Sequence, residues 1–154
     1  MDDFALTTAE RALLQALNQR RVRYLVIGLG AAVLQGAPVV TQDLDLWFER
    51  LGDDALHQAA RDAGGFWIAP FGIYPPGIGG EGLDRIDVVL TANGLDDFDS
   101  EYRRAIEHTV DGIEIKVLPL ERIIVSKRAA NRPKDLAVIP ALEATLRARD
   151  ASSG

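Results

Sequence analysis

Two aspartates that stand one residue apart, Asp43 and Asp45, are the side chains of this chain whose type and spacing best suit chemistry. Successive side chains of a β-strand point to opposite faces, so in a strand both carboxylates share one face. Paired carboxylates repel each other and lose hydration when buried, so a fold holds them at a surface or around a cation. Their oxygen atoms suit Mg²⁺ or Mn²⁺, which bind carboxylates together with substrate phosphates. The pair therefore indicates either a metal site or the polar face of an edge strand.

Two glycines precede the aspartates, Gly28 and Gly30, at the end of an apolar run that suits a buried strand over 24–28. Glycine lets backbone N–H groups approach a phosphate at the N-terminus of a helix. A G-x-G pattern is weak evidence alone. Its position ahead of the two aspartates favours one segment that holds a phosphate and a metal together.

A third acid, Asp87, lies within the apolar stretch 85–91, which predicts a strand. A carboxylate buried there without a partner is costly. Asp87 is therefore expected to pair with Arg85, to cap a loop, or to join the other two aspartates at a metal.

The elements that position these acids follow from periodicity and capping signals, such as the capping box that Thr7 and Glu10 predict at the start of the first helix. Helices are predicted over 7–20, 30–35, 53–63, 96–107, 120–130 and 133–149, the last kinked or divided at Pro140, and further strands over 44–49, 66–69 and in a hairpin at 108–118. The stretch 70–82 is too rich in glycine and proline for a regular element. It is expected to be a substrate-facing loop or a bulging connection, in which Phe71 and Tyr74 stack on a base or anchor the loop to the core.

Composition limits the alternatives. The chain has 154 residues, 47% of them hydrophobic and 26% charged, with no cysteine and a formal net charge of −6. We expect one domain over residues 1–150 and a disordered tail at 151–154, without disulfides or thiolate zinc sites. The start of the chain lacks the features of a signal peptide, and no apolar run approaches the ~20 residues that span a bilayer, so we expect a cytoplasmic protein. The negative charge argues against broad, non-specific binding to nucleic acid.

The segment from Gly28 to Asp45 resembles the signature of the nucleotidyltransferase superfamily that includes DNA polymerase beta. It is most similar to small bacterial members of the AbiEii toxin type and related minimal nucleotidyltransferases, whose core is roughly G-G-x-A, a helix, and G-x-P-R-x-T-x-D-x-D. Leu29 and Val39 stand where that core usually has its second glycine and its arginine. The residues in step with it are Gly28, Ala31, Gly36, Pro38, Thr41, Asp43 and Asp45.

A second segment, SKRAANRPKD at 126–135, resembles the K-x-x-x-x-R-x-K-D run that follows the catalytic sheet in AbiEii-type proteins. Lys127, Arg132, Lys134 and Asp135 match it, and Lys127 faces the nucleotide in that family. Without the upstream motif, the same segment is a solvated, charged helix-turn-helix.

The resemblance implies an α/β (α+β) fold, in which a small mixed sheet is flanked by helices and followed by C-terminal helices. It implies Mg²⁺ or Mn²⁺ as cofactor. It assigns metal binding and catalysis to Asp43, Asp45 and Asp87, with Asp87 as the third acid on a neighbouring strand. It assigns nucleotide binding to Gly28, Gly30, Thr41 and Lys127.

The implied activity is transfer of a nucleoside monophosphate from a nucleoside triphosphate (NTP), such as ATP, to a hydroxyl group, with release of pyrophosphate. The acceptor is RNA such as tRNA, a partner protein or a small molecule, and the resemblance suggests one half of a toxin–antitoxin pair with its cognate partner. One alternative is a binding or regulatory protein that has lost turnover, which Leu29 and Val39 favour. Another is a metal-dependent phosphohydrolase. Retention of three aspartates favours the active transferase, because an inactive site gains nothing from their repulsion.

Overall fold

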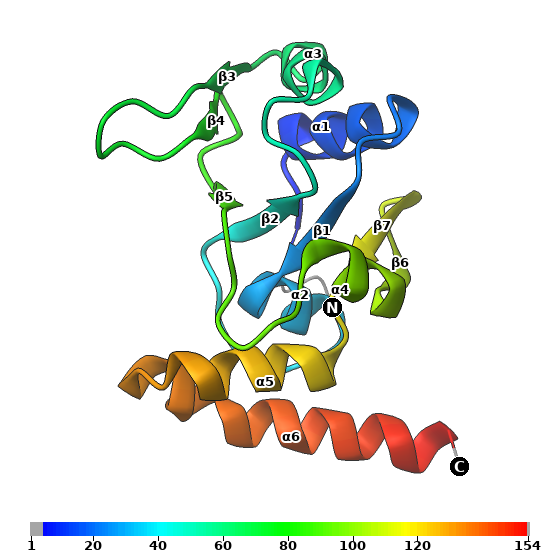
Figure 1. Cartoon of the computed structure of the whole chain (residues 1–154). Helices are drawn as coiled ribbons and strands as arrows, with labels where there is room; N and C mark the ends of the chain where they lie inside the picture. The colour runs from blue at the N-terminus through cyan, green and yellow to red at the C-terminus, as the bar shows by residue number, and fades with distance from the viewer. Residues whose placement is uncertain (1–4, 154) are drawn as a thin grey trace.

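The computed structural model describes residues 5–153, which form a five-stranded sheet, a separate two-stranded sheet and surrounding helices (Figure 1). The strands are β1 (Tyr24–Ile27), β2 (Leu44–Phe48), β3 (Phe66–Ile68), β4 (Gly77–Gly79), β5 (Ile86–Val89), β6 (Ile106–Val110) and β7 (Ile113–Val117). The helices are α1 (Thr8–Gln19), α2 (Gly28–Leu34), α3 (Asp54–Asp62), α4 (Phe98–Arg104), α5 (Leu120–Ala130) and α6 (Pro133–Ser153). None of the helices within residues 5–153 is both long and apolar enough to cross a membrane.

The larger sheet has the strand order β5-β2-β1-β7-β6 and is mixed. Strand β2 is antiparallel to β1 and parallel to β5, whereas β7 is parallel to β1 and antiparallel to β6. Strand β1 lies in the middle, and all four of its side chains are buried, as its apolar sequence predicts. The predicted α/β fold, with a small mixed sheet flanked by helices, is therefore confirmed.

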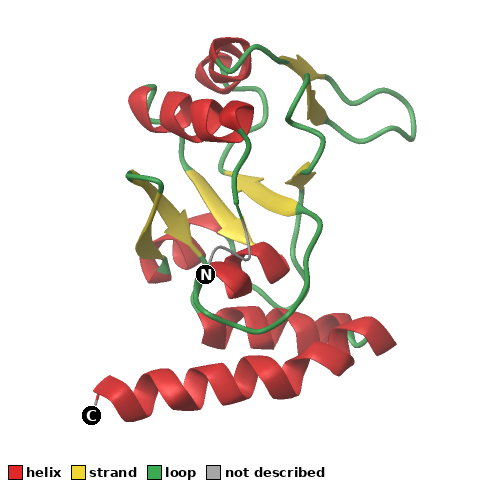
Figure 2. Ribbon diagram, turned by 180° about the vertical axis from the view of Figure 1, so that it is seen from behind, coloured by secondary structure: helices red, strands yellow, loops and turns green. Residues whose placement is uncertain are grey.

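The helices other than α4 form two groups (Figures 1 and 2). Helices α1 and α3 pack together on one side, and α2, α5 and α6 stack on the other, with α6 running along α5. In β2 the buried Leu44, Leu46 and Phe48 alternate with Asp45 and Trp47. The side chain of Asp45 consequently points toward the α2–α5 group, while its leucine neighbours point to the other side.

The N-terminus of α1 is joined to the start of β5. Thr7 and Glu10 form the predicted capping box, in which Thr7 Oγ1 accepts from the Glu10 N–H at 3.0 Å and the Thr7 N–H donates to Glu10 Oε1 at 2.9 Å. The same buried Glu10 carboxylate accepts from Arg85 Nε at 3.0 Å and Nη2 at 2.6 Å. Because Arg85 immediately precedes β5, this ion pair fixes the strand that carries Asp87.

The stretch 70–82 differs from expectation, because part of it is regular. Strand β4 pairs antiparallel with β3, and the two strands form a hairpin that projects from the body of the molecule (Figure 2). At its tip Phe71 and Tyr74 exchange backbone hydrogen bonds of 3.1 and 2.8 Å. Their side chains are 80% and 68% exposed, so neither anchors the hairpin to the core. The glycines at 77 and 79 suggest an irregular loop from sequence alone. In the structure both lie within β4, where side chains of β3 cover the strand and a Cβ at Gly79 would overlap the Phe66 ring.

Three helix ends also differ from expectation. Helix α4 begins only at Phe98, because Asp97 is the N-cap and accepts from the Ser100 N–H at 3.0 Å, and it ends where Ala105 becomes extended. Helix α6 passes through Pro140 undivided and continues to Ser153, so residues 151–153 of the expected disordered tail are helical and residue 154 lies outside the described part. Packing against α5 keeps α6 in one piece across the missing N–H of Pro140.

We expect Gly65→Ala to destabilise the protein by about 2 kcal/mol, because a Cβ at Gly65 would overlap the backbone oxygen of Gly79 and the Leu83 side chain. The matched control is Gly52→Ala, where a Cβ meets nothing within 4 Å, and it should change the free energy of unfolding by less than about 0.5 kcal/mol. Urea denaturation measures both. Equal stability of the two variants would show that the hairpin does not pack as described.

Candidate active site

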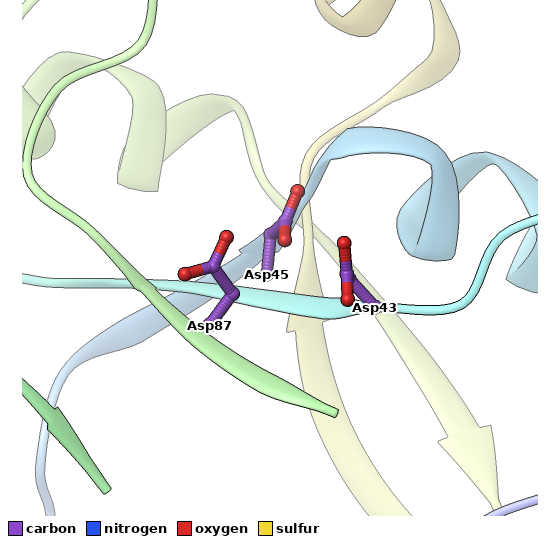
Figure 3. Close-up of side chains that lie close together, drawn as sticks. All are labelled: Asp43, Asp45 and Asp87. Carbon is purple, nitrogen blue, oxygen red and sulfur yellow. The ribbon is translucent and has the colours of Figure 1, made fainter. Parts of the chain in front are cut away.

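The structure brings the three predicted acids together at the join of β2 and β5. Asp45 is paired directly with Asp87 across the parallel ladder, and Asp43 immediately precedes β2. Each residue offers a carboxylate oxygen, and these oxygens lie within 4.8 Å of one another. Figure 3 shows the three side chains on the same side of the two strands. Such a set of hard oxygen donors fits Mg²⁺ or Mn²⁺.

The electrostatics of the cluster act most strongly on Asp45. Burial, followed by the charges of Asp87 and Asp43, raises the pKa of Asp45 from 3.8 to about 6, and only Lys127 acts in the opposite direction. Asp43 and Asp87 are exposed, so water stabilises their charges. The mutual repulsion of the three acids favours binding of a divalent cation between them.

Gly28 makes room for this cluster. Its φ is +70°, and a Cβ there would overlap Asp45 Oδ2. The sequence suggests that Gly28 and Gly30 approach a phosphate, and the structure adds a second requirement for glycine at 28. Gly30 is buried inside α2, whereas Leu29 lines the cavity in front of the acids. Phosphate binding by the two glycines stays a prediction.

Thr41 holds the chain at the entry to β2. Its hydroxyl donates to the Asp43 carbonyl oxygen at 3.1 Å and accepts from the Asp43 N–H at 3.3 Å. This small turn orients Asp43 toward the other two acids, and Thr41 lines the same cavity. Its nucleotide-binding role also stays a prediction.

Positive charge reaches the site from the α5–α6 junction. Lys127 of α5 lies 3.4 Å from Asp135 Oδ1, and Arg132 donates to Asp135 Oδ2 through its Nε at 2.6 Å and its backbone N–H at 3.2 Å. Asp135 is only 1% exposed, and its hydrogen bond from Arg132 lowers its pKa. The K-x-x-x-x-R-x-K-D motif includes Asp135, but the sequence predicts no role for this residue. The structure shows that it holds Lys127 and Arg132 in place.

The acids and these cations border one cavity of about 290 Å³. Its lining includes Asp43, Asp45 and Asp87 together with Lys127, Arg132 and Lys134. A second cavity of about 140 Å³ adjoins it and shares Asp45, Lys127, Arg132 and Asp135. A cavity that has both carboxylates for a divalent metal and positively charged side chains suits a polyanion that binds together with that metal.

Solved structures with a similar fold are nucleotidyltransferases. The enzyme ANT(2″)-Ia in complex with adenylyl-2″-tobramycin is 17% identical, with 93% of this chain and 90% of that chain covered and a TM-score of 0.61. The solution structure of the antibiotic-resistance factor ANT(2″)-Ia is 17% identical, with coverage of 94% and 92% and a TM-score of 0.55. An antigenic nucleotidyltransferase-like protein from Paracoccidioides brasiliensis is 16% identical, with coverage of 88% and 74% and a TM-score of 0.52.

The chain therefore has the nucleotidyltransferase fold, and the predicted resemblance to that superfamily is confirmed at the level of the fold. No protein-family model matches the chain, and no curated protein does. The assignment to the AbiEii type stays a prediction.

The raised pKa of Asp45 has a consequence for stability. Because this pKa lies near 6 in the folded protein and 3.8 otherwise, the folded chain holds the proton more tightly. The stabilisation is complete below about pH 4 and is lost as the pH rises through about 6. We expect Asp45→Asn to match the wild type at pH 4 and to exceed it at pH 7 by about 1–2 kcal/mol without metal, since partial exposure reduces the full effect. Urea denaturation across this pH range, with exposed Asp84→Asn as control, tests the expectation.

We expect Mg²⁺ and Mn²⁺ to raise the melting temperature by preferential binding to the folded state, as RT ln(1 + [L]/Kd). The Asp43→Asn/Asp45→Asn double variant should lose that response and be at least as stable as the wild type without metal, because the repulsion is gone. Sodium chloride at equal ionic strength is the control. If neither divalent ion changes the melting temperature of the wild type, the proposed metal site is wrong.

Proposed function

We propose that this protein is a metal-dependent nucleotidyltransferase that moves a nucleoside monophosphate from an NTP to a hydroxyl acceptor. The observation that carries the proposal is the convergence of Asp43, Asp45 and Asp87 opposite Lys127 in a nucleotidyltransferase fold. Mg²⁺ or Mn²⁺ held by the three aspartates supplies Lewis-acid stabilisation of charge on the phosphate oxygens.

The side chains divide the remaining work. Asp87 is exposed at the edge strand of the sheet, where an acceptor has access. Its carboxylate takes the proton of the acceptor hydroxyl as that oxygen bonds to the α-phosphorus. The bond between the α-phosphorus and the oxygen bridging to the β-phosphorus then breaks, and pyrophosphate leaves with that bonding pair.

The cations act on the leaving side. Lys127 borders the same cavity as the acids, where it neutralises charge on the triphosphate. Asp135 keeps Lys127 at the cavity wall, and Arg132 shares that anchor. Gly28, Gly30 and Thr41 are proposed to border the phosphates at the N-terminus of α2.

The acceptor is proposed as RNA, a protein side chain or a small molecule. Support for a small molecule comes from the neighbour ANT(2″)-Ia, whose structure holds adenylyl-2″-tobramycin. A toxin or antitoxin role with a cognate partner rests on the resemblance to AbiEii-type proteins. The second candidate function is a binding protein without turnover, which Leu29 and Val39 favour.

Lys127 provides the test. If Lys127 contacts the triphosphate, the Lys127→Ala substitution should weaken NTP binding by about 1.5–3 kcal/mol, which is roughly ten- to hundredfold in Kd. The matched control is Arg128→Ala, which removes a neighbouring cation of α5 that pairs with Glu143 and lies outside the cavity. Calorimetric titration with a non-hydrolysable NTP and Mg²⁺ compares both variants with the wild type, and Asp45→Asn should abolish the Mg²⁺-dependent binding.

Turnover is tested separately with labelled NTPs and candidate acceptors. Transfer of label by the wild type, lost in Asp87→Asn, supports the transferase. Nucleotide binding without transfer supports the binding protein. If the wild type and all variants bind alike, or the wild type does not bind millimolar NTP, the transferase proposal fails.

A further inference from the structure

The site is divided into two parts that differ in chemistry. The outer cavity, of about 290 Å³, is bordered by the three aspartates and three cations. The inner cavity, of about 140 Å³, adjoins it at Asp45 and Lys127 and continues beneath the loop that follows β5. The inner cavity is well below the ~300 Å³ at which ligand pockets usually begin and the outer cavity only reaches that size, so a ligand of NTP size needs both.

Apolar side chains line the inner cavity beside the charged groups that it shares with the outer one. They come from the end of β1, from β5 and the loop after it, from the segment after β7 and from α5, and they include Ile27, Val89, Leu95, Leu118, Ile123 and Ala130. A triphosphate placed against these apolar side chains would lose hydration without compensation, whereas the flat faces of a nucleobase lose little. The charged outer cavity has the opposite preference.

Three uncharged polar side chains also line the inner cavity. Thr91 and Asn93 belong to the loop after β5, and Ser126 belongs to α5, one residue before Lys127. Within residues 5–153 no hydrogen bond involves these three side chains, so their groups are available to a ligand. The Asn93 amide offers both donors and an acceptor, as the edge of a base requires.

The loop that carries Asn93 is held close to α5. Gly94 has a φ of +75°, and a Cβ there would meet Ala129 Cβ at 2.6 Å and the Val125 backbone oxygen at 3.2 Å. This close approach is possible only for glycine. It fixes Asn93 beside the cavity instead of leaving it on a free loop, and a fixed polar group discriminates between ligands better than a mobile one.

We propose that the inner cavity is the nucleoside subsite, in which Asn93 and Ser126 contact the base edge while the triphosphate lies among the acids and cations of the outer cavity. The proposal rests on the proposed transferase function and adds the residues that select the base. It places Lys127 at the boundary between the two subsites, which agrees with its presence in both cavities.

The experiment compares ligands that fill both subsites with one that fills only the outer one. ATP, GTP, CTP, UTP and inorganic tripolyphosphate are titrated with Mg²⁺ into the wild type, Asn93→Ala and Ala130→Leu. Ala130→Leu should fill the inner cavity and weaken every NTP at least tenfold, while tripolyphosphate changes by less than about twofold. Asn93→Ala should reduce the preference among the four NTPs by about two- to tenfold, the range for one hydrogen bond.

The control is Ala137→Leu, which adds the same side chain at an exposed position of α6 outside both cavities and should leave all affinities unchanged. Melting temperatures verify that each variant is folded. If the wild type binds NTPs but Asn93→Ala and Ala130→Leu bind them as the wild type does, the nucleoside subsite is wrong and the transferase stands. If the wild type binds neither NTP nor tripolyphosphate, both proposals fail.

Discussion

The mutual repulsion of three carboxylates is the constraint on which the rest of the structure depends. Asp45 faces Asp87 because the parallel register of β2 and β5 leaves no alternative, and burial places its pKa near 6. Neither strand can relieve this repulsion by moving, since both belong to the sheet. Within the described residues, Lys127 lowers the pKa of Asp45, so the acids on the sheet and the cations that border the same cavity are electrostatically coupled.

Three other carboxylates, all fully buried, hold the layers of the molecule together. Glu10 joins α1 to the start of β5, Glu101 accepts from Arg122 and Arg104 to join α4 to α5, and Asp135 joins α5 to α6. Removal of one partner from such a pair leaves a buried charge and is strongly destabilising. Each pair lies next to an element that borders the candidate site. The buried pairs of Glu10, Glu101 and Asp135 with arginine thus fix the elements around Asp43, Asp45 and Asp87, whose own carboxylates are exposed or half-buried.

Much of this arrangement is predictable from sequence because it depends on local periodicity. Strand alternation placed Asp43 and Asp45 on one face, the resemblance to nucleotidyltransferases added Asp87 on a neighbouring strand, and the capping box of α1 was evident from Thr7 and Glu10. The remainder depends on contacts between distant residues. The burial of Asp135 requires α6 to fold back on α5, and the second role of Gly28 requires Asp45 to lie opposite. Strand β4 was missed because its glycines are explained only by the side chains of β3.

The projecting hairpin combines exposed apolar side chains with an absence of charge. No charged residue lies between Asp62 and Glu81, and Ile73 at the hairpin tip is 93% exposed beside two exposed aromatic rings. In dilute buffer the net charge of −6 keeps molecules apart. Added salt screens that repulsion without weakening the attraction between apolar surfaces. We therefore expect high-salt buffers to increase the retention of this protein on hydrophobic media and its self-association through the hairpin.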